Sequence, residues 1–315
     1  PAQQSADEEN QLLSQLIQLQ SEDAEAARNF LRCNRQFYDP QMVGQLYQEV
    51  VKLAPVDLDK AERLAHTASW LADELDDDAC RAQSLRADGH IDYFRGRYRG
   101  ALEHYQAALD LFRRLGRPIE VALTLTGSLQ TLIYLGHYEQ AFAWGREARE
   151  ILERIGDRLR LARLDNNMGN ILFRQDRSEE ALELYLRAYE EFQKQDAVRD
   201  IAVALRNILV CHVSLNDVDR ALEVYQRTRA YCQQQGLSRL VFEVDFNIAY
   251  LYYLRGDYAR ALRLYQLARE QSEKVGDTYY KALCDLDQCE IYIELNRCEE
   301  GARMAQRALE HFEEL

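Results

Sequence analysis

The chain has 315 residues and a net charge of −14 at pH 7. Nonspecific nucleic-acid binding relies on Lys and Arg side chains that neutralise phosphates, so this acidic balance argues against a nucleic-acid partner. No apolar run approaches the roughly 18 to 20 residues of a membrane span, and the seven cysteines lack paired C-x-x-C spacing, so we expect a cytoplasmic protein with reduced thiols and no membrane partner.

The first 40 residues do not match the 40-residue repeat that the rest of the chain follows. Leu12, Leu13 and Leu16 lie at helical spacing and predict a short amphipathic helix. A helical solenoid needs a cap that covers the apolar face of its first repeat. We therefore expect residues 1–40 to form an N-terminal helical cap and residues 41–315 to form about seven 40-residue repeats.

A small residue recurs every 40 positions along the remaining chain. Its seven positions are Ala61, Ala101, Ala141, Ala181, Ala221, Ala261 and Gly301. A second small residue follows seven positions after each, and in four repeats a tyrosine lies between the two, at Tyr105, Tyr185, Tyr225 and Tyr265. Small residues let helices approach closely, and the ring fills the space beside them.

Residues that tolerate a left-handed backbone conformation recur every 20 positions from 96 to 296. They are Gly96, Gly116, Gly136, Gly156, Asp176, Asp196, Asn216, Gly236, Gly256, Gly276 and Asn296. Such residues end helices, so the chain divides into segments of about twenty residues, two per repeat. With four prolines and no sustained period-2 stretch, the sequence predicts an all-α solenoid of helical hairpins.

The pattern resembles the tetratricopeptide repeat (TPR) family. That family has small residues at these places, an aromatic between them, and a Gly-x-Tyr turn, seen here at residues 96–98, 136–138 and 256–258. The unit is six residues longer than the common 34, as in the subfamily that includes spindle-orientation adaptors and kinesin light chains. The resemblance implies a right-handed TPR superhelix whose first helices line a concave face that binds a protein or an extended peptide.

A narrower resemblance is to the N-terminal TPR arrays of bacterial proteins that carry a CHAT domain, a caspase-like cysteine protease. It rests on phrases such as Leu-Asp-Asn-Asn-Met-Gly-Asn at 164–170 and Asn-Ile-Ala-Tyr-Leu-Tyr-Tyr at 247–253. These 315 residues contain no protease domain. The resemblance implies the sensor or regulatory part of a larger bacterial protein.

Asparagines recur at the repeat spacing and predict a ligand site. A side-chain amide can donate to a backbone C=O and accept from a backbone N–H, so an Asn ladder would grip an extended peptide whatever its sequence. The alternative is that these amides bond neighbouring helices within the array. The candidate ligand-binding residues are Arg163, Asn166, Asn167, Asn170, Arg174, Arg206, Asn207, Asn247, Tyr250, Tyr253, Asp287 and Glu290.

Charged residues on the same helices suggest a polarised groove. The three arginines of the candidate set would meet a ligand carboxylate, while Asp287, Glu290 and Glu294 follow one another at helical spacing at the far end. The alternative is that all six are solvated charges of ordinary helix surfaces.

The sequence offers no constellation for chemistry. His212 follows Cys211 directly, but adjacent helix residues point about 100° apart and cannot act as base and nucleophile. Asp285, Asp287 and Glu290 lie on one straight helix and do not converge on a metal ion. We expect a scaffold without enzyme activity, metal or cofactor. A sensor of small signalling peptides and an assembly scaffold for a multiprotein complex are the alternatives.

The helix-ending residues place the next turn at position 316, beyond Leu315, and the last hairpin keeps the internal apolar pattern. An uncapped repeat presents the apolar side meant for a successor. We therefore expect a truncated array that associates end to end or frays over residues 298–315.

Overall fold

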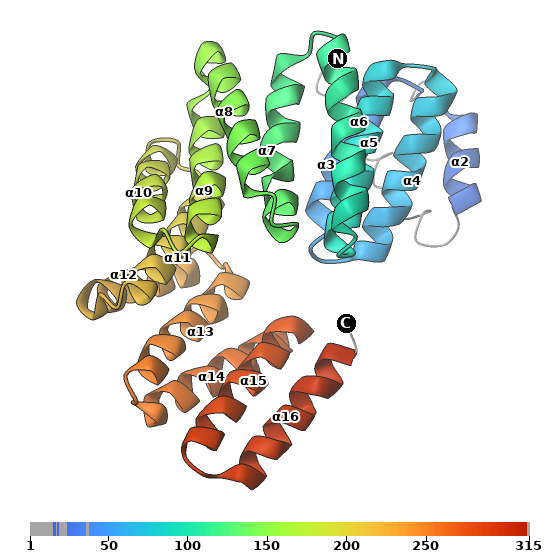
Figure 1. The fold of residues 1–315 in the computed structure, drawn as a ribbon. Coiled ribbons are helices and arrows are strands. Elements are labelled where there is room, and N and C mark those ends of the chain that lie inside the picture. Colours follow the sequence, from blue (N-terminus) through green and yellow to red (C-terminus); the bar gives the residue numbers. More distant parts are fainter. Residues whose placement is uncertain (1–14, 17, 19–23, 36–37, 314–315) are drawn as a thin grey trace. The chain divides into compact units, whose positions relative to one another are not determined.

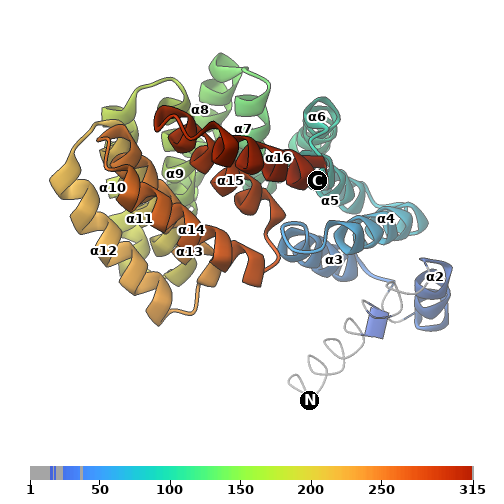
Figure 2. The ribbon, with the colours of Figure 1, turned by 90° about the horizontal axis from the view of Figure 1, so that it is seen from below.

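The computed structural model describes residues 15–16, 18, 24–35 and 38–313, so residues 1–14, 17, 19–23 and 36–37 of the expected cap lie outside the described residues. The described residues form fifteen α-helices and no strand (Figure 1, Figure 2), which confirms the all-α solenoid fold. They divide into two compact units, Pro1–Gly156 and Asp157–Leu315.

Each 40-residue repeat contributes an odd-numbered first helix and an even-numbered second helix. Unit 1 contains α2 (Ala24–Cys33), α3 (Pro40–Leu53), α4 (Leu58–Leu75), α5 (Asp78–Phe94), α6 (Tyr98–Arg114), α7 (Pro118–Tyr134) and α8 (Tyr138–Ile155). Unit 2 contains α9 (Arg158–Arg174), α10 (Ser178–Lys194), α11 (Val198–Ser214), α12 (Val218–Gln234), α13 (Ser238–Leu254), α14 (Tyr258–Lys274), α15 (Thr278–Glu294) and α16 (Cys298–Glu313). Within unit 2, the first helices α9, α11, α13 and α15 also contact one another in series, so they form a continuous layer.

The predicted turns are confirmed. Every Gly, Asn and Asp of the 20-residue punctuation from 96 to 296 has a positive φ, from 49° at Asp196 to 77° at Gly156. At the first of these turns, the Gly96 N–H donates to the Tyr93 C=O at 3.1 Å and the Arg97 N–H to the Asp92 C=O at 2.8 Å. These bonds satisfy carbonyl groups that a helix end would leave without partners.

The small residues of the second helices pack as the sequence predicts. Residues that occupy the same place in successive repeats, 40 positions apart, form a column. In the column of Ala61, the six alanines up to Ala261 are 0% exposed, and Gly301 is buried. The tyrosine ring packs on a small residue of the preceding first helix. A Cβ added at Gly169 would lie 2.6 Å from the Tyr185 ring. Where Leu209 stands at the equivalent position, Tyr225 is only half-buried and donates its hydroxyl hydrogen to Asp245.

Three buried aspartates tie first helices to second helices in unit 2. Asp165 accepts two bonds from Arg187, at 2.6 and 2.7 Å. The same column of the repeat holds Asp245 and Asp285, both 0% exposed, and each accepts an Nε–H bond at 2.8 Å, from Arg229 and Arg269 respectively. Removing one partner of such a pair leaves an uncompensated buried charge, so the first pair helps to fix the packing within a hairpin and the other two that between neighbouring repeats.

The two ends of the described chain differ in burial. Leu16, Ala27 and Leu31 are 0% exposed in the core cluster that α3 and α4 share, although the division at residue 40 stays a prediction. In α16, Leu309 and Phe312 are 52% and 37% exposed, and end-to-end association through them stays a prediction. None of the described helices is both long enough and apolar enough to cross a membrane.

The close glycine–tyrosine contacts lead to a stability prediction. Gly89→Ala and Gly169→Ala should each lower the free energy of unfolding by about 1–3 kcal/mol, because the added Cβ would lie 2.9 Å from the Tyr105 ring and 2.6 Å from the Tyr185 ring. The control is Gly127→Ala in α7, where an added Cβ meets no atom within 4 Å. It should stabilise the helix by about 0.5–1 kcal/mol. Thermal melting followed by circular dichroism compares the three, and equal effects would contradict the packing argument.

Candidate functional site

Two asparagines of the candidate set, Asn166 and Asn207, belong to a chain of polar contacts inside unit 2. Asn207 donates its Nδ2–H to the Asn166 Oδ1 at 3.0 Å and accepts from Arg206 at 3.1 Å. Arg206 also pairs with Glu243, which accepts from Arg239 at 3.2 Å. Asn166 and Asn207 are only 8% exposed, and the bond between their amides joins two successive first helices. For these two residues the contact is the alternative that the sequence left open, an amide bond between neighbouring helices of the array.

Two of the three arginines expected to meet a ligand carboxylate already pair with carboxylates of the protein, and their contact with a ligand stays a prediction. Arg163 forms an ion pair with Asp200 on the next first helix, with N–O distances of 2.8 to 3.2 Å. Arg206 is bound by Glu243 in the same way, one repeat later. Burial alone would lower the pKa of Arg206, but Glu243 raises it, so the guanidinium stays charged. The third arginine of the candidate set, Arg174, is exposed, and no carboxylate of the described residues pairs with it.

The remaining asparagines have separate environments. Asn170 accepts the Tyr185 hydroxyl bond at 2.8 Å, which holds α10 against α9. Asn167 is half-buried and also interacts with another group. Asn247 is half-buried, and the described residues provide no hydrogen-bond partner for its amide. Of the predicted ladder, Asn247 therefore has the amide that is available to a ligand.

Asn247 lines a hollow on the layer of first helices in unit 2. The hollow has a volume of about 320 Å³ and lies across three successive first helices. Its lining is mostly apolar and comprises Phe173 of α9, Val210, Val213 and Ser214 of α11, and Phe246, Asn247, Tyr250 and Leu254 of α13. Tyr250 and Leu254 are 43% and 52% exposed, so apolar surface there remains accessible to solvent.

Carboxylates continue the same face on α15. Forty residues after Asn247, Tyr250 and Leu254 stand Asp287, Glu290 and Glu294, and α13 contacts α15. Burial raises the pKa of the half-buried Tyr253 hydroxyl, and the charges of Glu290 and Glu294 raise it further. No Lys or Arg of the described chain forms an ion pair with these three carboxylates, so the strip next to the hollow carries uncompensated negative charge.

Neither the cysteine nor the acidic residues weighed for chemistry are placed to perform it. Burial raises the pKa of the Cys211 thiol to about 12, so it stays protonated at neutral pH and is a poor nucleophile. Asp285 is engaged by Arg269, away from Asp287 and Glu290. Among the described residues, no three His, Cys, Asp or Glu side chains are grouped to hold a metal ion.

Apart from Tyr250, the apolar lining of the hollow was missed from the sequence. Val210 and Tyr250 occupy the column of Asn170, and Phe173 and Val213 share the column of Tyr253. Apolar residues at solvent-facing positions of successive first helices were the available signal. The buried Asp245 and Asp285 were also detectable, since each follows an arginine by 16 residues.

A family model supports the repeat assignment. Residues 160–234 match the tetratricopeptide repeat model. No curated protein sequence matches the chain significantly.

Solved structures with the same TPR fold cover most of the chain. Aspartyl phosphate phosphatase F from Bacillus subtilis matches with a TM-score of 0.65 and 16% identity over 90% of this chain and 75% of that one. A Rap protein complexed with competence and sporulation factor matches with a TM-score of 0.62 and 15% identity over 88% of this chain and 99% of that one. NprR in complex with its cognate peptide NprX matches with a TM-score of 0.63 and 14% identity over 85% of this chain and 78% of that one. At these identities the likeness shows the fold alone.

The polar chain between TPR helices leads to a mutational prediction. Asn207→Ala should lower the free energy of unfolding by about 1–3 kcal/mol, because it leaves the buried Asn166 side-chain oxygen without its donor and removes one acceptor of Arg206. Asn247→Ala, the matched control 40 residues later, should change it by less than about 0.5 kcal/mol. Urea unfolding measures both. Equal losses would show that Asn247 also has a structural role.

Asp287 leads to a pH prediction. Burial raises the pKa of its carboxyl from 3.8 to about 6, and the neighbouring Glu290 acts in the same direction. The folded protein therefore binds a proton that the unfolded chain releases, so ionised Asp287 destabilises the fold as the pH rises between these two values. Asp287→Asn should raise Tm at pH 7.5 and change it little at pH 4. The exposed control Glu183→Gln should shift Tm equally at both, and the same behaviour in Asp287→Asn would refute the assignment.

Proposed function

We propose that the first-helix face of unit 2 binds an extended protein segment or peptide that carries an apolar residue next to a basic one. The observation that carries the proposal is the 320 Å³ hollow with the unneutralised carboxylates of α15 beside it. The neighbouring TPR structures named as complexes with competence and sporulation factor and with the peptide NprX support a peptide as the class of ligand.

Binding would use three kinds of contact. An apolar side chain enters the hollow against Val210 and Phe246, where burial contributes about 25 cal/mol per Å² of apolar surface. The Asn247 amide bonds the ligand backbone, and a basic side chain meets Glu290 or Glu294. The polar chain through Asn207 and Glu243 holds the helices in place beforehand, so the ligand does not have to order the site.

We infer a role in binding and regulation without chemistry at this face. One structural neighbour is an aspartyl phosphate phosphatase by name, but its likeness extends to the fold alone. The role of sensor or regulatory part in a larger bacterial protein, including one with a CHAT protease, stays a prediction, as do the cytoplasmic location and the alternative of an assembly scaffold.

A phage-displayed library of random dodecapeptides tests the proposal. Selected peptides should be enriched in an apolar residue followed closely by Lys or Arg, and their binding should weaken as salt rises. Val210→Glu places a charge in the hollow and should weaken binding by at least about tenfold.

The charge contribution has its own matched control. Glu290→Gln combined with Glu294→Gln should weaken the binding of basic peptides and make that binding less sensitive to salt. Glu183→Gln combined with Glu190→Gln removes the same charge from the second helix α10 and should leave binding unchanged. A library without enrichment, or selected peptides that bind the Val210→Glu protein as tightly as the unaltered chain, would overturn the proposal.

A further inference from the structure

Unit 1 contains a second cavity, and seven of its nine lining residues are polar or charged. It has a volume of about 250 Å³, many times the space that one water molecule needs, and it lies between α4, α5 and α6. Its polar lining comprises Glu62, His66 and Ser69 from α4, Asp88 and Asp92 from α5, Arg97 from the following turn, and His104 from α6.

Two of these polar residues, Asp92 and His104, stand where other repeats have apolar ones. The column of Asp92 holds Leu132 and Leu172 in the next two repeats. The column of His104 holds only apolar residues elsewhere, namely Trp144, Leu184, Val224, Leu264 and Met304. The column of Tyr105 holds Ala65 in the first repeat, and this alanine lines the cavity.

A glycine accommodates the Asp92 carboxylate. A Cβ built on Gly100 would lie 2.7 Å from the Asp92 Oδ2, whereas later repeats carry Gln, Glu or Arg in that column. The substitutions at Asp92, Gly100 and His104 therefore depend on one another physically. Three helices depart from the repeat pattern around one cavity, as expected of a ligand site.

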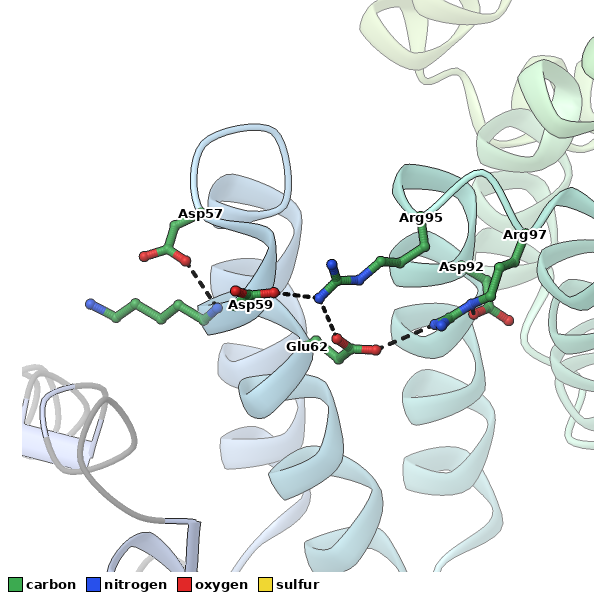
Figure 3. Close-up of polar contacts among 7 residues, drawn as sticks. Asp57, Asp59, Glu62, Asp92, Arg95 and Arg97 are labelled. Carbon is green, nitrogen blue, oxygen red and sulfur yellow. Dashed lines mark hydrogen bonds and ion pairs between the residues drawn. The ribbon is translucent and has the colours of Figure 1, made fainter. Parts of the chain in front are cut away.

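Contacts in the cavity leave one carboxylate without a cation. Arg97 donates to Asp92 at 2.6 Å and to Glu62 at 3.3 Å, and Figure 3 shows it reaching between these two side chains from the turn after α5. Arg95 lies beside it and bonds Glu62 at 2.5 Å. Asp88 accepts only the Ser69 hydroxyl bond, at 3.2 Å. The lining thus holds three carboxylates against one guanidinium.

We propose that this cavity binds a primary ammonium group on a short aliphatic chain, with Asp88 as its counterion. An ammonium group is a compact charge with three donors, and the carboxylates of Asp88 and Asp92 line the cavity as acceptors. His104 lies against the second of them, with its Nδ1 3.1 Å from the Asp92 Oδ2. The group can come from a free small amine or from a lysine side chain of a partner protein. The proposal does not depend on the hollow of unit 2.

The electrostatics of the lining predict how binding varies with pH. Burial raises the pKa of Asp88, while His104, the Ser69 hydroxyl and His66 oppose the rise. Glu62, Asp92 and Arg97 complete the charged groups that face the cavity. Acidification protonates Asp88 and removes the negative charge that would hold a bound cation. Affinity should therefore fall as the pH is lowered.

Titration calorimetry of the whole chain with n-butylammonium chloride and with acetyl-lysine N-methylamide tests the proposal. We expect saturable binding, weakened at least about tenfold by Asp88→Asn, which removes a charge-assisted contact but keeps an acceptor for Ser69. His104→Leu introduces the residue of the equivalent positions 184 and 264, and it should abolish binding while the protein stays folded. The control is Asp110→Asn, an exposed carboxylate of α6, which should bind as the unaltered chain does.

The two probes separate the sources of the amine. Tighter binding of the lysine derivative supports a partner side chain, and equal or tighter binding of butylammonium supports a free amine. Absence of saturable binding by both, or unchanged affinity in Asp88→Asn and His104→Leu variants that melt normally, would overturn the proposal.

Discussion

Close contact between helices at the small-residue positions is the constraint on which the rest of the structure depends. Ala101 and its equivalents are fully buried, and bulkier side chains there would push the second helix away from its neighbours. The tyrosines then fill the remaining space, tightly enough that Gly89 and Gly169 have no room for a Cβ. A left-handed residue after each helix from α4 to α15 keeps the next one in the same register.

Within this frame, polar residues of the first helices in unit 2 have two different roles. Asn166, Asn207 and Glu243 satisfy one another across successive first helices, and the buried aspartates satisfy arginines of the second helices. Buried polar groups are stable only when they are paired, so these residues are committed to the fold. Groups that the fold leaves unpaired, such as Asn247 and Glu290, are the ones available for a partner.

Departures from the repeat pattern mark both candidate sites. In unit 2, Val210 and Tyr250 replace the Asn170 type of residue and produce an apolar hollow. In unit 1, Asp92 and His104 replace apolar residues and produce a polar cavity. A regular repeat needs only its register residues to fold, so other columns can vary in chemistry from one repeat to the next without altering the backbone.

The sequence by itself determined the periodic part of this protein. Small residues every 40 positions and turn residues every 20 specify helix lengths, helix ends and pairing, because these depend on interactions between near neighbours in the chain. Only the tertiary structure decided which polar side chains remain available. Asn207 and Asn247 occupy the same column, yet the first is bound by Asn166 and Arg206 and the second faces the hollow. That difference depends on side chains about 40 residues away, which meet only when successive first helices pack against one another.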